Sequence, residues 1–248
     1  MIGMIWTSHR MRIDKFISRQ GHTRAEARVL LKSGRVTVDG TIVRDGAFSI
    51  DEKTARVRLD GEDILYTPEL HLMLNKPAGV LTAADDARRE TVMDLLPKIA
   101  RSQGCMPVGR LDMDTEGLLI FTSDGRLAHR LLSPKRRVEK RYQAIVDAPL
   151  SYNDVEAFAA GVPLSDFVAL PATLEMAEDA RTAYVTLTEG KYHQVKRMFA
   201  ARGKYVVSLR RLAFGGVWLD PTLTPGGWRA LTPSETETLY DAAGMRER

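Results

Sequence analysis

The chain has 248 residues, and its 36 Lys and Arg against 32 Asp and Glu give a formal net charge of +4. Hydrophobic residues make up 44% and charged residues 27%, which is typical of a soluble globular protein with one or two domains. The single cysteine, Cys105, cannot form an internal disulfide and offers no metal-ligand spacing. A disulfide-rich secreted scaffold and a structural zinc site are therefore disfavoured.

The N-terminal segment shows no targeting signal. Its apolar start, Met1–Trp6, is too short for a signal peptide, and no apolar run approaches the roughly 20 residues of a membrane span. We therefore expect a cytoplasmic protein with no membrane partner. Met11 begins the first patterned segment, so residues 1–10 are interpreted as an extension.

Basic residues gather in three segments. Met11–Arg58 has eleven Lys or Arg against six acidic residues, Arg126–Gln143 has seven against one, and Arg181–Arg211 has eight against one. One such segment alone fits a solvated surface, but three together favour a polyanionic partner with a long footprint.

Residues 11–58 form a pattern of two short helices and a hairpin. Ile13–Ile17 has helical spacing, Thr23 and Glu26 form a capping box for a second helix, and Gly34 is placed to end it. Asp39-Gly40 between two short β-branched runs then predicts a type I′ hairpin.

The second of these helices carries a basic stripe. Arg24, Arg28 and Lys32 recur every four residues, about 6 Å apart along one face, and Arg35 follows the helix. This spacing suits successive phosphates of a nucleic acid. The segment resembles the S4 RNA-binding domain, which implies docking on structured RNA through the two helices and the hairpin, and the four basic residues are the candidate RNA contacts. A DNA-reading helix-turn-helix is the alternative, and the hairpin directly behind the helix disfavours it.

A linker is predicted at 59–69, followed by a larger domain at 70–240 and a tail at 241–248. In the larger domain we expect a helix at Thr91–Leu96 and further helices at Arg126–Leu132 and Tyr192–Ala201. Residues 71–80 are expected to form a strand that ends in a Pro/Gly turn, and further strands are expected at 118–122, 140–146, 172–176, 182–188 and 206–210. The fold class is therefore α+β, a small α/β module followed by a domain with a mixed, mainly antiparallel sheet and flanking helices.

The segment Gly109–Gly125 places Arg110 and Asp112 in a polar loop ahead of the buried run Leu118–Phe121. A carboxylate held on such a loop suits a nucleophile or a base. On spacing alone, a turn or helix-capping carboxylate is the favoured interpretation.

The full string narrows these possibilities. Its pattern is Gly-Arg-Leu-Asp, two residues, Thr, one residue, Gly and a four-residue apolar run. It resembles the signature of the pseudouridine synthase family that modifies ribosomal RNA. The resemblance implies that Asp112 is the catalytic nucleophile and that Arg110 enters the space left by the flipped base. Asp114 has no counterpart and is interpreted as a turn or cap residue.

Two further motifs carry the same resemblance. His71–Val80 is similar to the family's first motif, in which Lys76 and Pro77 are structural support. An enzyme that acts on a base must flip it out and hold it on an apolar or aromatic surface. Lys140-Arg141-Tyr142 resembles the motif whose tyrosine stacks on the target uracil, although a lone Tyr142 would equally fit a core aromatic.

Val185–Phe199 resembles the motif that contains the cation paired with the catalytic aspartate. Lys196 takes that place and Arg197 is the fallback, while Leu187 matches the apolar residue that closes the other side of the uracil. His193 is interpreted as a hydrogen-bonded structural histidine, because no second ligand stands at metal spacing. No glycine-rich phosphate loop is evident, so no metal, organic cofactor or nucleotide cofactor is expected.

The string Tyr192–Phe199 resembles the RsuA-type branch of the family, whose usual substrate is small-subunit 16S ribosomal RNA. This implies isomerisation of a uridine to pseudouridine by a monomer, on naked RNA or on an assembly particle. Two alternatives stay open: the same chemistry on 23S or transfer RNA, and a non-catalytic RNA-binding factor in ribosome assembly.

Overall fold

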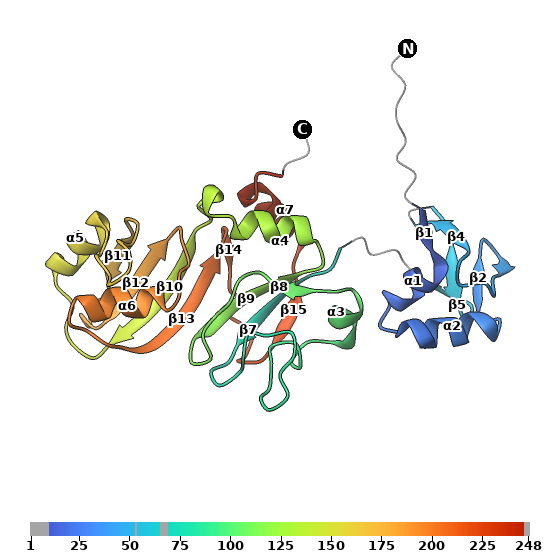
Figure 1. The fold of residues 1–248 in the computed structure, drawn as a ribbon, viewed down its shortest axis with the longest axis horizontal. Helices are drawn as coiled ribbons and strands as arrows, with labels where there is room; N and C mark the ends of the chain where they lie inside the picture. Colours follow the sequence, from blue (N-terminus) through green and yellow to red (C-terminus); the bar gives the residue numbers. More distant parts are fainter. Residues whose placement is uncertain (1–9, 53, 65–68, 246–248) are drawn as a thin grey trace, which may run out of the picture. The chain divides into compact units, whose positions relative to one another are not determined.

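The computed structural model describes residues 10–52, 54–64 and 69–245, which fall into two compact units (Figure 1). The first unit contains the described residues up to Leu70 together with Pro97–Cys105, and the second contains His71–Leu96 and the described residues from Met106 onward. None of the helices in these described ranges has the length and apolarity needed to cross a bilayer.

The first unit has the two helices and the hairpin that the sequence predicts. Helix α1 covers Ile13–Ser18 and helix α2 covers Arg24–Lys32, which begins with the Thr23–Glu26 capping box. Asp39 and Gly40 have φ of 50° and 82°, as a type I′ turn requires. The other elements are β1 (Arg10–Arg12), β2 (Val36–Val38), β3 (Thr41–Ile42), β4 (Ser49–Asp51), β5 (Val57–Leu59), β6 (Glu62–Ile64) and α3 (Lys98–Ser102).

Strand β6 lies inside the segment 59–69 that the sequence predicts as a linker. It pairs with β5 and completes a sheet of order β3-β2-β5-β6. The positive φ of Asp60 and Gly61 makes the tight turn between these strands. The sheet therefore continues past the predicted boundary at residue 58, and residues 65–68 lie outside the described ranges.

The second unit is built on one mixed sheet of order β11-β12-β10-β13-β9-β7-β15, with β14 on β13 and β8 on β9. All its pairings are antiparallel except that of β13 with β9, which agrees with the predicted fold class. The strands are β7 (His71–Lys76), β8 (Met106–Pro107), β9 (Glu116–Thr122), β10 (Lys140–Val146), β11 (Thr173–Met176), β12 (Thr182–Leu187), β13 (Val206–Phe214), β14 (Val217–Trp218) and β15 (Trp228–Ala230).

Helices pack on both ends of this sheet (Figure 1). Helices α4 (Gly125–Leu132) and α7 (Pro233–Ala242) contact each other, and their Leu127, Leu131 and Leu239 share a core with β7 and β9. Helices α5 (Tyr152–Ala160) and α6 (Gln194–Ala201) accompany the β10–β12 end, with the rings of Phe158 and Phe199 4.9 Å apart. A short 3-10 helix covers Pro134–Arg136.

The two halves of the sheet, β11-β12-β10-β13 and β9-β7-β15, join where β9 runs parallel to β13. Gly117 pairs with Arg211 there and has a φ of +97°. A Cβ on Gly117 would lie 2.3 Å from the Arg211 carbonyl oxygen, so a side chain does not fit. The buried Arg211 donates from Nε to the Leu118 carbonyl oxygen at 2.7 Å, which ties the strands together directly beyond the Asp112 loop.

Several predicted elements differ from the structure. The helix expected at Thr91–Leu96 is wrong: this segment is a turn in which Thr91 donates from its amide and hydroxyl to Asp94 Oδ2, both at 2.8 Å. Strand β13 continues to Phe214, beyond the predicted Arg210. Helix α7 ends at Ala242, inside the segment interpreted as a tail.

Candidate active site

The loop that carries Asp112 rests on a buried lysine. Lys76, at the end of β7, is fully buried and donates from Nζ to the carbonyl oxygens of Pro77, Met113 and Thr115 at 2.9, 3.2 and 2.9 Å. Burial lowers the pKa of Lys76 to about 8. Its three ammonium hydrogens match three carbonyls, so the side chain holds the loop from beneath.

Backbone hydrogen bonds fix the loop on both sides of Asp112. Thr82 Oγ1 donates to the Leu111 carbonyl oxygen at 2.7 Å and accepts from the Leu111 amide at 3.2 Å. The Thr115 amide donates to the Asp112 carbonyl oxygen at 3.1 Å, which closes a turn. The Asp112 carboxylate therefore projects from a rigid loop.

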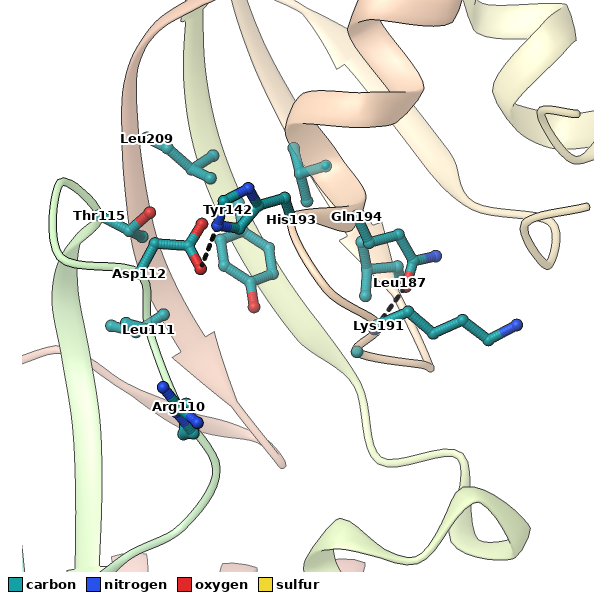
Figure 2. Close-up of a pocket in the computed structure, with 12 residues that line it drawn as sticks. Arg110, Leu111, Asp112, Thr115, Tyr142, Leu187, Lys191, His193, Gln194 and Leu209 are labelled. Atoms are coloured by element: carbon teal, nitrogen blue, oxygen red, sulfur yellow. Dashed lines mark hydrogen bonds and ion pairs between the residues drawn. The ribbon is translucent and has the colours of Figure 1, made fainter. Parts of the chain in front are cut away.

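Two side chains at the start of α6 face this carboxylate. Lys196 Nζ lies 3.0 Å from Asp112 Oδ2, and His193 Nε2 lies 3.5 Å from Oδ1, as Figure 2 shows for His193. The Asp112 side chain keeps 29% of its surface exposed, so an incoming substrate can reach it. From the sequence, His193 is interpreted as a hydrogen-bonded structural histidine, and in the structure its ring nitrogen faces the candidate nucleophile.

Asp114 lies in the turn between Asp112 and Thr115, as predicted, and its side chain makes a further contact. Its Oδ1 lies 2.6 Å from Lys196 Nζ, so one ammonium bridges two carboxylates. Burial lowers the pKa of Lys196, but the hydrogen bonds to Asp114 and Asp112 outweigh it and the pKa is raised. The hydrogen bond from Lys196 in turn lowers the pKa of Asp114.

The turn before α6 explains how Lys196 reaches the site. His193 adopts the left-handed conformation, with a φ of 49°, so the helix begins at Gln194 rather than at the predicted Tyr192. The buried Gln194 accepts from the Lys191 amide at 2.9 Å and donates to Glu189 Oε1 at 2.5 Å. This bracing aims the first turn of α6 at Asp112.

A pocket opens beside Asp112 with about 450 Å³ of space that is partly open to solvent. Tyr142 from β10 and Leu187 from β12 line it and are nearly buried (Figure 2). Arg110 stands exposed at the rim and makes no hydrogen bond or ion pair within the described residues. The other lining residues are Leu111, Thr115, Gly190, Lys191, His193, Gln194, Val195 and Leu209.

Arg197, the fallback partner of Asp112, lies elsewhere. It forms an ion pair with Asp166, and its guanidinium carbon lies 5.3 Å from the centre of the Phe167 ring. It does not line the pocket, because a helix turns neighbouring side chains by about 100°. The geometry therefore favours Lys196 as the cation on Asp112, and the predicted substrate contact of Arg197 lacks support.

The four basic residues that are predicted to contact RNA differ in their surroundings. Arg24, Arg28 and Lys32 are exposed on α2. Arg35 instead forms two hydrogen bonds with Asp60, at 2.8 and 2.5 Å, so its guanidinium is already occupied.

Within the described ranges, no three His, Cys, Asp or Glu side chains form a group that could hold a metal ion.

Comparison with known proteins places both units. The family model for RNA pseudouridylate synthase matches residues 70–201, and the S4 domain model matches residues 11–54. The chain belongs to the RNA pseudouridylate synthase family. It is a pseudouridine synthase of the RsuA type with an S4 domain, and hence an isomerase, as the resemblance of its motifs implies.

Relatives match over nearly the whole pseudouridine synthase. It is 43% identical to the "Uncharacterized RNA pseudouridine synthase YtzG" of Bacillus subtilis (strain 168), over 93% of this chain and 99% of the relative. It is 42% identical to the "Ribosomal small subunit pseudouridine synthase A" of Escherichia coli (strain K12), over 92% of this chain and all of the relative. A solved structure described as "Crystal structure of pseudouridylate synthase" has a TM-score of 0.65 and 36% identity, covering 92% of this chain and 99% of that one.

Sequence reasoning did not identify three supporting contributions to the site. Thr82 and Gly117 act through hydrogen bonding and close backbone approach, which no local pattern encodes. Asp114 is two residues from Asp112, but its contact is with Lys196, 82 positions later. For Gly117, the available signal was a glycine at the start of an apolar strand, a place where backbones often approach closely.

Proposed function

We propose that this enzyme converts a uridine of small-subunit 16S ribosomal RNA to pseudouridine, with Asp112 as the catalytic carboxylate. The target class is supported by relatives at 41–42% identity, from Vibrio cholerae and Escherichia coli, that are named ribosomal small subunit pseudouridine synthase A. Each aligns over at least 92% of this chain and all of its own length, so both units take part in the likeness. The same chemistry on 23S or transfer RNA remains the alternative for the experiments below.

The pocket geometry suits a flipped uridine. Tyr142 presents a ring for stacking, and Leu187 supplies an apolar surface beside it. Arg110 is exposed and unpaired among the described residues, so it is available to enter the gap that the flipped base leaves in the RNA. Each of these three side chains lines the pocket that contains Asp112.

The reaction needs a group at the ribose that stays ionised and oriented. The C1′ to N1 bond breaks, the uracil turns, and a C1′ to C5 bond forms, while N1 gains a proton and C5 loses one. Asp112 acts on the ribose by addition or by proton abstraction, and the hydrogen bond from the ammonium of Lys196, at 3.0 Å, orients its carboxylate in either route. Bond making offsets bond breaking within one nucleotide, so the isomerisation needs no energy source.

The first unit supplies binding rather than chemistry. Its exposed Arg24, Arg28 and Lys32 lie on one helix at a spacing that matches phosphates. None of them belongs to the pocket in the second unit. We assign this stripe to docking on the RNA outside the target nucleotide.

The observation that carries the proposal is the Asp112 carboxylate in a pocket with Tyr142 and Leu187, held by Lys196. Loss of tritium from RNA labelled at C5 of uridine reports the reaction, because the C5 hydrogen leaves when C1′ bonds to C5. Asp112→Asn should abolish tritium release while RNA affinity stays within about threefold, since one side chain contributes little beside many phosphate contacts.

Asp114→Asn is the matched control for this experiment. Asp114 shares the same lysine but is mostly exposed and is absent from the pocket lining. The Asn variant should keep most of the activity because Lys196 remains on Asp112. Substantial turnover by Asp112→Asn would remove Asp112 from the mechanism, and equal loss in both variants would mean that the two carboxylates act as a pair.

A further inference from the structure

An exposed aromatic ring lies between two residues that line the pocket. Tyr192, between Lys191 and His193, keeps 76% of its surface exposed. Its ring stacks on the His193 ring with centroids 3.8 Å apart and planes 17° from parallel. One face of the tyrosine is therefore covered by an imidazole and the other is open.

This stack is anchored to the catalytic centre. His193 Nε2 lies 3.5 Å from Asp112 Oδ1, so the two rings lead outward from the reacting carboxylate. The backbone around them is held by Gln194, which accepts from the Lys191 amide and is itself buried. The backbone next to Tyr192 is therefore braced, and the Tyr192 ring itself is supported on one face by the His193 ring.

Flipping a uridine creates a need that such a ring can meet. When the target base leaves the stack, the adjacent base loses a stacking neighbour. Stacking of a base on a protein aromatic ring contributes about 1–3 kcal/mol, whatever the base. Lys191 precedes Tyr192 and lines the same pocket, but its ammonium lies 3.4 Å from the centre of the Phe167 ring and 4.0 Å from Glu189 Oε2, so its charge already has partners.

We propose that Tyr192 is a stacking platform for the nucleotide next to the flipped uridine. The subsite rests on the proposed function, since it requires a flipped uridine in the pocket. The competing explanation is that Tyr192 only holds His193 against Asp112. That explanation predicts an effect on the chemical step, whereas a subsite acts on RNA binding.

The test uses the full protein and a small-subunit ribosomal RNA fragment that the parent protein modifies. 2-Aminopurine replaces the base on the 5′ or the 3′ side of the target in two separate RNAs, and its fluorescence reports stacking. Three variants are compared with the parent: Tyr192→Leu, Tyr192→Phe and Tyr205→Leu. Tyr205 is a matched control because it is 68% exposed in the same unit and does not line the pocket.

The subsite predicts that the parent and Tyr192→Phe quench 2-aminopurine on one side of the target and that Tyr192→Leu does not. Kd for Tyr192→Leu should rise about 5- to 100-fold, the equivalent of one stacking interaction. Its single-turnover rate at saturating RNA should change less than about threefold. Tyr205→Leu should match the parent in every readout.

Equal Kd and equal quenching for the parent and Tyr192→Leu would overturn the subsite. So would a loss confined to the saturating rate, because it would place the ring in support of His193 alone. Pseudouridine formation by the parent is followed separately on small-subunit RNA. Its absence there would count against the proposed function, so the two failures are distinguishable.

Discussion

Lys196 and Arg197 are adjacent cations with different partners. Lys196 bridges Asp112 and Asp114, whereas Arg197 pairs with Asp166 outside the pocket. Of these two residues, Lys196 contacts the candidate nucleophile and Arg197 does not. Substituting each in turn therefore separates the effect of the Asp112 contact from the effect of a nearby positive charge.

Replacing Lys196 with Met should lower the single-turnover rate about 100-fold or more, because Asp112 loses the ammonium that lies 3.0 Å from its carboxylate and orients it. Arg197→Met should lower it less than about threefold, since an ion pair with an exposed partner contributes little. Tritium release at saturating RNA measures both rates. Similar losses in the two variants would show that general positive charge, rather than the Asp112 contact, matters.

Tyr142 offers a second comparison at one residue. Its side chain is nearly buried in the pocket, and its hydroxyl makes no hydrogen bond within the described residues, so the ring is the feature expected to act. Tyr142→Leu should reduce kcat/KM about 5- to 100-fold, the equivalent of one base stack, and Tyr142→Phe should stay within about threefold of the parent. If both variants lose equally while circular dichroism shows intact folding, the hydroxyl is the active group.

At the level of elements, the junction of β9 and β13 sets the position of the Asp112 loop. The loop leads directly into β9, and Gly117 allows the Arg211 backbone to approach where a Cβ would clash. The junction thus couples the sheet end that carries Asp112 to the end that carries Tyr142.

Gly117→Ala should destabilise the second unit by about 2–4 kcal/mol, because the new methyl group meets backbone atoms and the positive φ is unfavourable for alanine. Gly125→Ala is the control: its Cβ meets open space at the start of α4. That change should be neutral or stabilise by up to about 1 kcal/mol. Urea unfolding followed by the fluorescence of Trp218 and Trp228 measures both, and a Gly117→Ala midpoint equal to that of the parent would contradict the role of the junction.

Elements with strong local signals could be predicted from the sequence. The alternation in Lys140–Val146 predicted β10 with its observed bounds, and Asp39-Gly40 marked the hairpin. The prediction of a helix at Thr91–Leu96 was wrong. Thr91 and Asp94 have the spacing of a helix start, but Thr91 pairs with Leu81 in a β-bridge, and Pro97 follows the segment. Helices α5 and α7 were missed although Ser151 and Thr232 begin capping boxes.

The part of the candidate site that could be predicted from the sequence is the part that lies in the family motifs. Asp112, Tyr142 and Leu187 line one pocket, and Lys196 contacts Asp112, as the motifs imply for this arrangement. The positions of Arg197, Asp114 and His193 could not be read from the sequence, because each depends on a partner brought close by the fold. For His193, no neighbouring residue in the sequence indicated a partner, because Asp112, whose Oδ1 lies 3.5 Å from His193 Nε2, is far away in the sequence.

At the scale of the whole molecule, we propose that the first unit contributes to RNA binding and that the second carries out the chemistry. The stripe Arg24, Arg28 and Lys32 lies in the first unit, and the pocket residues lie in the second. Contacts made equally in the ground state and the transition state change KM without changing the rate at saturation.

Replacing all three stripe residues with Ala should weaken RNA binding and flatten the slope of log affinity against log salt by about 0.7–0.9 for each phosphate that the protein no longer neutralises. The saturating single-turnover rate should hardly change. Arg35→Ala is a useful comparison because Arg35 is paired with Asp60 and should alter the slope less than any stripe residue. An unchanged slope in the triple variant would show that the stripe is a solvated helix face.

The most direct test of the proposed function is a map of pseudouridines in all stable RNAs of a strain whose own gene encodes Asp112→Asn. We expect pseudouridine to disappear from 16S ribosomal RNA, with 23S and transfer RNA unchanged, and to return when the parent gene is supplied. An unchanged 16S map, or a loss confined to 23S or transfer RNA, would contradict the assignment of 16S ribosomal RNA as the substrate.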